Sequence, residues 1–178
     1  MNVFMPALKL VWERTKRVDA KRMKKEKYPN GIKEFRDIPY IEDGNKYHLL
    51  DVYFPENASV SLPVLIDVHG GGWMYGTKEI NKCYCHHLAK QGFIVVNINY
   101  RLAGKVLFKE QIKDIFAAFK WISENMVSCP ADMCNVVIIN ELRESCTCCP
   151  SSYLRPWNCP SQLNGQRRSL TQEYIHQC

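Results

Sequence analysis

Two continuous apolar runs constrain the fold of this 178-residue chain more than any other feature. Residues 63–69 read Pro-Val-Leu-Ile-Asp-Val-His, and residues 92–100 read Gly-Phe-Ile-Val-Val-Asn-Ile-Asn-Tyr. Strands that lie between two layers of helices are apolar on both faces, so they show such runs instead of strict alternation. A third run of this kind covers residues 135–139. The three runs together predict a mostly parallel sheet with helices on both faces.

The segments around these runs complete an α/β pattern. Residues 34–41 and 47–54 read as strands separated by the turn sequence Glu-Asp-Gly-Asn, which predicts an antiparallel hairpin. Apolar residues at helical spacing predict helices over residues 6–27, 79–91 and 108–122. We therefore expect a mostly parallel, twisted sheet with an N-terminal antiparallel hairpin and flanking helices.

The charge of the chain is concentrated in one segment. The formal net charge is +6, and residues 1–36 hold eleven lysines and arginines against four acids. We interpret this segment as the solvated face of an amphipathic helix, with contact to phosphates or anionic lipid as the alternative, and we expect no nucleic-acid partner. No run reaches the roughly 18 apolar residues that a membrane span needs. Without a span or a signal peptide, we expect a cytoplasmic protein with free thiols.

Composition divides the chain into three parts. After residue 140 there are no lysines, four arginines and five of the nine cysteines. We expect residues 1–30 to form a basic amphipathic helix that serves as a cap or leader, and residues 31–140 to form the sheet domain. Residues 141–178 read as an irregular, Cys- and Pro-rich tail. Our hypothesis is that this tail arises from a shifted reading frame, a splice change or a chimeric gene model.

The sequence His69-Gly70-Gly71-Gly72-Trp73 directly follows the first buried run. Glycines let a backbone turn sharply and bring its N–H groups close to a ligand. Backbone donors fixed in this way stabilise the oxyanion of an acyl-transfer intermediate. A plain glycine-rich turn is the structural alternative, but the full motif after a strand is typical of lipases and esterases.

Together with Tyr-Arg-Leu-Ala at residues 100–103, this motif resembles the hormone-sensitive-lipase group of α/β-hydrolases. The resemblance covers roughly residues 30–140, with Gly104 where the family usually has proline. It implies the N-terminal half of an α/β-hydrolase fold. It also implies carboxylic ester hydrolysis by a serine acyl-enzyme route, on a small acyl-ester substrate and without a cofactor.

The resemblance implies a role for each residue of the glycine motif. The backbone N–H groups of Gly71 and Gly72 are the implied oxyanion donors, and Gly70 permits the turn. His69 is implied as a support of the loop, because the family's catalytic base lies near the C-terminus. Trp73 either lines the substrate pocket or packs beneath the loop. The structural positions of the next strand and helix correspond to Tyr100, Arg101 and Asp114.

The family's nucleophile elbow, Gly-Asp-Ser-Ala-Gly, has no counterpart in this sequence. The corresponding residues 140–145 read Asn-Glu-Leu-Arg-Glu-Ser, which puts bulky side chains where a strained turn needs small ones. Ser145 is a weak candidate nucleophile. Glu173 and His176 follow it in the family's order, but they are too close in sequence to come from two later strands. We therefore expect an inactive, apparently truncated chain whose strand at residues 135–139 leaves an edge open to self-association.

Two interpretations from other classes stay open. Residues 83–87 (Cys-Tyr-Cys-His-His) and 146–149 (Cys-Thr-Cys-Cys) concentrate zinc-binding side chains, although their spacing lacks the usual paired C-x-x-C pattern. The same fold without catalysis would make a truncated, noncatalytic interaction protein. Activity towards a short ester separates that protein from an enzyme, and metal analysis separates both from a zinc module.

Overall fold

The structure is a computed structural model that describes residues 4–58, 61–126 and 131–140. Its elements are α1 (Phe4–Met23), β1 (Ile32–Pro39), β2 (Leu49–Pro55), β3 (Leu62–Val68), the 3₁₀ turn η1 (Lys78–Asn81), α2 (Lys82–Lys90), β4 (Ile94–Ile98), α3 (Phe108–Asn125) and β5 (Ala131–Asn140). Within these ranges, none of the helices has the length and apolarity needed to cross a membrane. The expected cytoplasmic location stays a prediction from the sequence.

The described strands form one mixed sheet in the order β1-β2-β4-β3-β5. β2 pairs antiparallel with both β1 and β4, whereas β3 pairs parallel with both β4 and β5. In the central register, Ile66 of β3 lies opposite Val96 of β4 and Ile138 of β5. The predicted hairpin and α/β sheet are therefore confirmed, and the three apolar runs form β3, β4 and β5. The sheet is mixed, since two of its four strand pairings are antiparallel and two are parallel.

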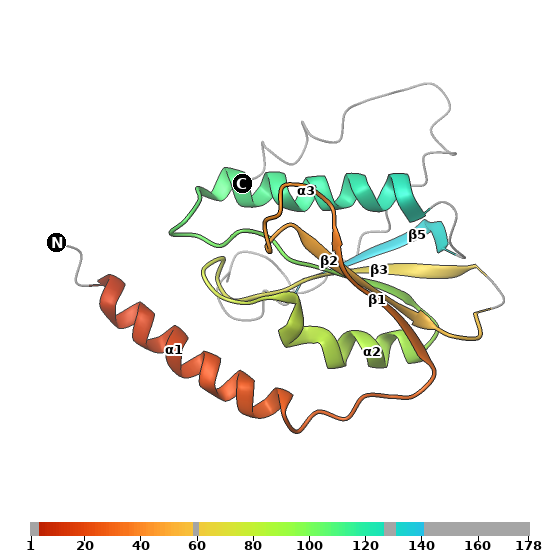
Figure 1. Cartoon of the computed structure of the whole chain (residues 1–178), viewed down its shortest axis with the longest axis horizontal. Helices are drawn as coiled ribbons and strands as arrows, with labels where there is room; N and C mark the ends of the chain where they lie inside the picture. The colour runs from red at the N-terminus through yellow and green to blue at the C-terminus, as the bar shows by residue number, and fades with distance from the viewer. Residues whose placement is uncertain (1–3, 59–60, 127–130, 141–178) are drawn as a thin grey trace.

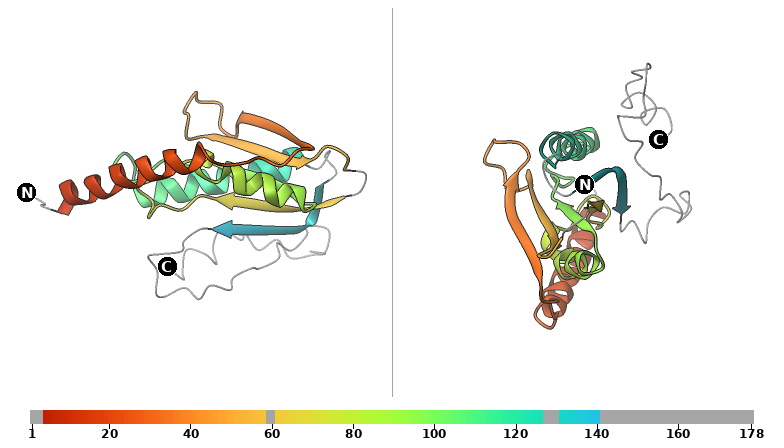
Figure 2. Two further views of the ribbon diagram at one scale, coloured as in Figure 1. Left: turned by 90° about the horizontal axis from the view of Figure 1, so that it is seen from below. Right: turned by 90° about the vertical axis from the view of Figure 1, so that its right-hand side faces the viewer.

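Helices cover both faces of this sheet, as Figure 1 and the right-hand view of Figure 2 show. Alternate residues of each central strand point to opposite sides. On β3, Val64 and Ile66 belong to the core beneath α3, and Leu65 belongs to the smaller core beneath α2. Full burial of each such side chain stabilises the fold by roughly 1.5–3 kcal/mol. Burial on both sides explains why these strands carry unbroken apolar runs.

The N-terminal helix α1 lies on the same side of the sheet as α2 (Figures 1 and 2). Most of its described side chains are exposed, and the partly buried ones recur at helical spacing at Trp12, Thr15, Asp19 and Met23. The predicted amphipathic helix is therefore present, and one of its faces contacts the sheet domain. Its role as a cap or leader stays a prediction.

The structure differs from the sequence-based expectation in three places. The helix predicted over residues 79–91 is split, because a 3₁₀ turn precedes α2. β1 has a register shift between Phe35 and Ile38, where Asp37 takes a left-handed backbone with φ 56°. The expectation of free thiols holds for Cys83 and Cys85. It is wrong for Cys134, which is disulfide-bonded and lies exposed on β5.

Candidate active site

The glycine motif forms a tight turn after β3, and we call residues 69–77 the glycine loop. Its centre has a left-handed backbone at three successive residues, with φ 116° at Gly71, 58° at Gly72 and 64° at Trp73. The Gly71 carbonyl accepts hydrogen bonds from the N–H groups of Met74 (3.2 Å) and Tyr75 (3.1 Å). Within the described residues, the N–H groups of Gly71 and Gly72 donate no hydrogen bond. The turn thus leaves two adjacent backbone donors unused.

Trp73 fixes the middle of the glycine loop to the rest of the domain. Its carbonyl accepts hydrogen bonds from the N–H of Ala103 and from Nε2 of Gln111, both at 2.8 Å. Its ring packs against Tyr100, at 5.5 Å between centroids, and edge-on against Phe108 at 5.0 Å. Trp73 therefore packs against the residues after β4 and the start of α3.

His69 lies buried at the start of the glycine loop, with 2% of its surface exposed. Its Nδ1 lies 2.9 Å from the Gly70 carbonyl, and its ring stacks on Tyr100 at 4.4 Å between centroids. The Tyr100 hydroxyl in turn donates to the His69 carbonyl at 3.0 Å. Burial lowers the pKa of His69 to about 4, although the contact with the Gly70 carbonyl opposes that shift. A neutral imidazole held by its own loop suits a supporting residue.

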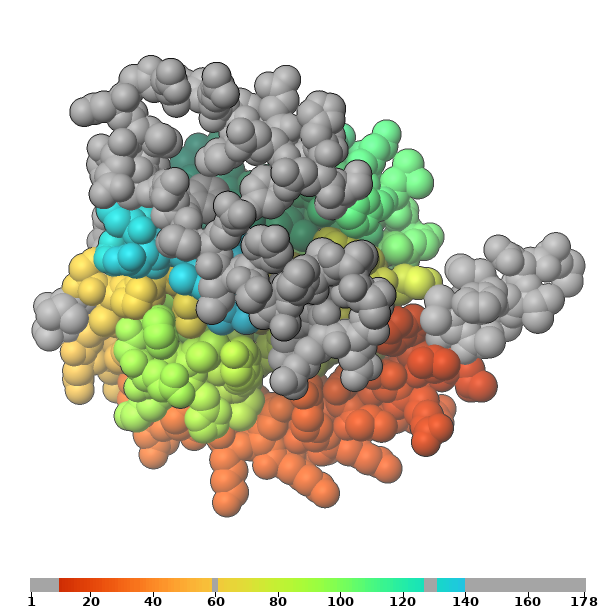
Figure 3. Space-filling model, turned by 180° about the vertical axis from the view of Figure 1, so that it is seen from behind, coloured from red at the N-terminus to blue at the C-terminus, as the bar shows by residue number. Residues whose placement is uncertain are grey.

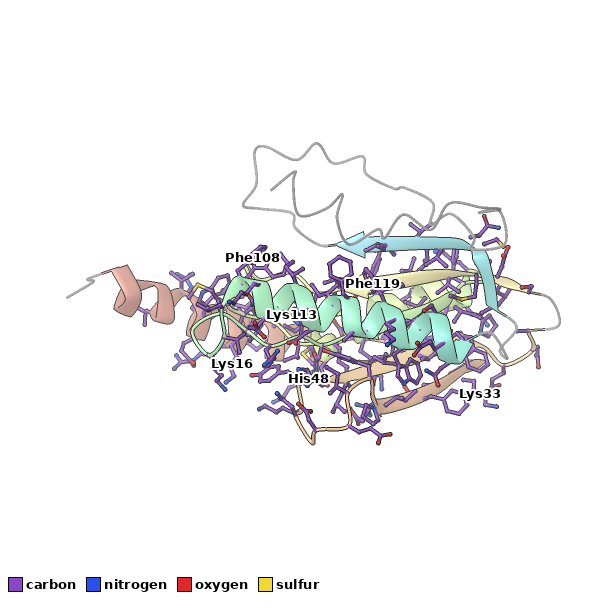
Figure 4. All side chains as sticks on the ribbon, turned by 90° about the horizontal axis from the view of Figure 1, so that it is seen from above. Lys16, Lys33, His48, Phe108, Lys113 and Phe119 are labelled. Carbon is purple, nitrogen blue, oxygen red and sulfur yellow. The ribbon has the colours of Figure 1, made fainter. Side chains whose placement is uncertain are left out.

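Arg101 and Asp114 join the end of β4 to α3. The guanidinium of Arg101 donates two hydrogen bonds to the Asp114 carboxylate, at 2.8 and 2.6 Å, and the Arg101 N–H donates a third at 3.1 Å. Burial by itself raises the pKa of Asp114, but these hydrogen bonds outweigh it and lower the pKa. His48 lies 3.3 Å from the same carboxylate, on the side of α3 that faces the β1–β2 hairpin (Figure 4). The structural positions implied by the sequence are confirmed here.

Lys78 anchors the chain directly after the glycine loop, a role that was not predicted from the sequence. Its side chain is fully buried, and its ammonium lies 2.8 Å from both Asp37 and Asp51. Its backbone N–H and carbonyl bond to the side chains of Asn99 and Asn97, each at 2.7 Å. Burial alone lowers the pKa of Lys78, but the hydrogen bonds to the two aspartates raise it above its ordinary value. The one hint of this cluster in the sequence is Asp51, an acid inside the otherwise apolar strand β2, because a buried carboxylate needs a partner.

The helix α1 packs on the outer side of the glycine loop. Trp12 stacks on Tyr75, and the Tyr75 hydroxyl donates to the Asp19 carboxylate at 2.8 Å. Arg22 donates to the Ile80 carbonyl at 3.1 Å. A cavity of about 190 Å³ lies between helix and loop, and its walls include Trp12, Gly70, Gly71 and Tyr75. The cavity therefore lies beside one of the two implied oxyanion donors.

The described residues hold no cluster of histidine, cysteine and acidic side chains that could bind a metal ion. On α2, Cys83 and His87 both contact the Lys27 carbonyl. The candidate nucleophile Ser145, the residues Glu173 and His176, and the cysteines at 146–149 lie outside the described residues.

Comparisons with known proteins match the same region. Residues 50–140 match the family model BD-FAE. Carboxylesterase NlhH of Mycobacterium tuberculosis is 32% identical over 92 residues, which cover 51% of this chain and 28% of that relative. Kynurenine formamidase of Danio rerio is 37% identical over 70 residues, which cover 39% of this chain and 23% of that relative. The chain thus spans about a quarter of the length of these relatives.

The fold also matches solved structures of esterases. Esterase B from Lactobacillus rhamnosis superposes with a TM-score of 0.73 at 31% sequence identity, over 76% of this chain and 44% of that one. The sheet order and the flanking helices are therefore those of a partial α/β-hydrolase fold of the esterase type, as the sequence predicted.

Proposed function

Because this chain belongs to the BD-FAE family, within the α/β-hydrolase esterases, we propose that its glycine loop is the oxyanion hole of a carboxylic ester hydrolase. The observation that carries the proposal is the pair of unused N–H groups at Gly71 and Gly72, held in a left-handed turn at the end of β3. In ester hydrolysis, negative charge develops on the carbonyl oxygen as the tetrahedral intermediate forms. Two fixed backbone donors stabilise that charge, and loss of one such donor raises the activation energy by roughly 3–4 kcal/mol.

His69 and Lys78 support this proposal as positioning residues. Oxyanion donors are effective only when they are held in place before the reaction, so the loop must not move as charge develops. His69 packs under the first part of the loop, and Lys78 fixes the chain just after it. Neither residue contacts the reacting atoms in this proposal.

The nucleophile is the part of the mechanism that this sequence does not supply. No Gly-x-Ser-x-Gly sequence occurs among the 178 residues, and Arg143 and Glu144 stand where the family's elbow has small residues. We therefore propose that the chain by itself does not hydrolyse esters. Ser145 does not act as a nucleophile in this proposal.

The substrate class follows from the cavity beside the loop. We propose that the cavity of about 190 Å³ between α1 and the glycine loop takes the acyl or alcohol part of a small ester. The walls from α1 would make residues 1–30 part of a cap over the site. The resemblance to a formamidase keeps amide hydrolysis as the alternative within the same fold.

The sheet edge at β5 gives the partner proposal. Among the described strands β5 pairs with β3 alone, and its residues 136–139 are all apolar. An unpaired apolar edge is a template for another strand. We propose that copies of the chain associate through this edge, and sedimentation at rising concentration tests it. A mass that stays at one chain throughout would contradict self-association.

A short ester, p-nitrophenyl butyrate, tests the activity proposal on the full chain. The expected rate equals the uncatalysed rate, both for the chain and for Ser145→Ala. Turnover that Ser145→Ala abolishes would show that this chain carries its own nucleophile.

A chimera tests the oxyanion hole separately. In it, residues 1–139 are followed by the part of Lactobacillus rhamnosis esterase B that comes after the equivalent strand. The chimera is expected to hydrolyse the ester. Gly71→Ala keeps the backbone N–H group but forces the turn to shift, because its Cβ would lie 2.1 Å from the Tyr75 carbonyl oxygen, so the displaced donor is expected to lower kcat by about 100-fold. A folded chimera with no activity, or one that Gly71→Ala leaves unchanged, would contradict the assignment of the glycine loop.

A further inference from the structure

The exposed side of α1 and of the turn that follows it is strongly basic. Between residues 10 and 27 there are eight lysines and arginines against three acids, and all eight cations are exposed. Figure 3 shows the red atoms of α1 on the outer rim of the molecule, and Figure 4 shows Lys16 there. This surface, which we call the basic rim, is the largest concentration of like charge in the sequence.

Two of the three acids of the same segment are turned away from the basic rim. Asp19 and Glu26 lie on the side that faces the sheet domain, where their side chains are only 18% and 14% exposed. Both contact Arg22, and Asp19 also accepts the hydrogen bond from Tyr75. The negative charge is therefore neutralised against the domain, and Glu13 is the remaining acid of α1 on the exposed side. This separation of charge makes the rim more positive than the composition of the segment suggests.

Large aliphatic side chains lie among these cations. Leu10 is 74% exposed, Val11 55% and Val18 58%. At the same end of the molecule, Leu107 and Phe108 are 66% and 52% exposed, and Figure 4 shows Phe108 at that end and Lys33 at the opposite one. None of these side chains contributes to either described core.

We propose that the basic rim docks this protein on an anionic phospholipid surface. Clusters of four to eight lysines and arginines on an amphipathic helix attract anionic headgroups. Aliphatic side chains between the cations enter the layer beneath those headgroups, and the stems of lysine and arginine lie along it. The phosphate backbone of a nucleic acid would attract the cations but would leave Leu10, Val11 and Val18 without an apolar partner. The inference is independent of whether the chain hydrolyses an ester.

The docked helix is also in contact with the glycine loop. Trp12 lies on the opposite face of α1 from Arg14, Arg17 and Lys21, and its ring stacks on Tyr75. The helix α1 alone therefore separates a lipid surface bound at the rim from the cavity at Gly70 and Gly71. Docking would bring the mouth of that cavity to the surface from which an apolar substrate arrives.

Vesicle flotation with the full chain tests the proposal. Vesicles of phosphatidylcholine with phosphatidylserine are expected to carry the protein, vesicles of phosphatidylcholine alone are not, and added salt is expected to release it. The triple variant Arg14→Glu, Arg17→Glu, Lys21→Glu is expected to bind at least about 100-fold more weakly, since each cation near an anionic surface contributes roughly fivefold. The matched variant Lys33→Glu, Lys90→Glu, Lys120→Glu changes net charge equally and is expected to bind within about threefold of the parent.

A second variant separates lipid docking from simple attraction between charges. Leu10→Ser, Val11→Ser, Val18→Ser keeps every cation and is expected to weaken binding to the anionic vesicles while leaving binding to duplex DNA unchanged. Circular dichroism checks that each variant is folded as the parent is. The proposal would be overturned if the parent protein did not bind anionic vesicles, or if it bound DNA more tightly than vesicles. It would also be overturned if the two charge-reversal triple variants lost the same amount of vesicle binding.

Discussion

The indole ring of Trp12 stacks on the phenol ring of Tyr75, with 5.3 Å between ring centroids and 10° between ring planes. This contact joins the N-terminal helix to the glycine loop across 62 intervening residues of sequence. The Tyr75 hydroxyl donates a hydrogen bond to Asp19, two turns further along the same face of α1, so a single loop residue holds the helix at two points. Burial and this hydrogen bond together raise the pKa of Tyr75, which therefore keeps its proton as a donor.

Removal of the indole should loosen the glycine loop. Trp12→Ala is expected to speed backbone amide exchange over residues 69–77 by roughly tenfold, because an aromatic pair contributes about 0.5–1.5 kcal/mol beyond its buried area. Hydrogen exchange followed by mass spectrometry measures it. Leu10→Ala, at a side chain that is 74% exposed on the same helix, is the control and should leave the loop unchanged. Equal exchange in the two variants would show that α1 does not restrain the loop.

Lys78 should be the most costly lysine to remove from this fold. Lys78→Met leaves the buried carboxylate of Asp51 without its ammonium, and breaking a buried ion pair on one side costs about 3–5 kcal/mol. Urea unfolding followed by circular dichroism gives the change in the free energy of unfolding.

Lys113→Met provides the comparison for that measurement. Lys113 pairs with Glu110 at 3.1 Å but is 69% exposed, and exposed pairs contribute at most about 1 kcal/mol. A loss in Lys78→Met no larger than in Lys113→Met would mean that the Lys78 cluster does not anchor the chain after the glycine loop.

The parts of this structure that the sequence predicts are those set by local pattern. β3 and β4 are recognisable because strands that are buried on both faces lack an alternation of polar residues. Residues 69–73 are recognisable because their three glycines permit the left-handed backbone of a tight turn. Each of these signals lies within one short segment. Together they predict the fold class, since right-handed crossovers leave few ways to connect parallel strands, whereas the strand order comes from the structure.

Lys78 shows why the remainder could not be predicted. In sequence it follows Thr77 and precedes Glu79, which suggests the exposed start of a helix. Its burial depends on Asp37 and Asp51, which lie 41 and 27 residues away. Asp37 lies in the register shift of β1, where the backbone leaves strand geometry at φ 56°. Partners brought together by the completed sheet leave no periodic signal along the chain.

Replacement of Gly71 and of Gly72 by alanine should lower the free energy of unfolding by different amounts. A Cβ at Gly71 would lie 2.1 Å from the Tyr75 carbonyl oxygen, and its φ of 116° is unsuited to any residue with a side chain. A Cβ at Gly72 would lie 3.6 Å from the Trp12 ring, an ordinary contact, and its φ of 58° falls in the left-handed region. Gly72→Ala is therefore expected to cost about 1–2 kcal/mol, and Gly71→Ala at least about 3 kcal/mol.

Urea unfolding of both alanine variants in parallel checks this difference. Each variant is the control for the other, because both lose one glycine's freedom in the unfolded chain. Equal losses of stability would mean that the Gly71 backbone can relax away from Tyr75, and that the turn is less tightly fixed than the contacts to Met74 and Tyr75 indicate.

His69 should make the stability of the protein depend on pH. Burial lowers its pKa to about 4, whereas in the unfolded chain the pKa is near its ordinary value of about 6.5. Between those values the unfolded chain binds a proton that the folded chain does not. The free energy of unfolding that depends on a neutral His69 is therefore fully present above about pH 6.5. It is lost as the pH falls towards 4, at up to about 1.4 kcal/mol per pH unit.

His69→Phe keeps a ring to stack on Tyr100 and removes the titrating group, so its free energy of unfolding should fall less between pH 7 and 4.5. Urea titrations across that range measure both slopes, and the other histidines cancel in the difference. Identical slopes would mean that His69 is protonated inside the folded loop, and its role as a neutral support would then be wrong.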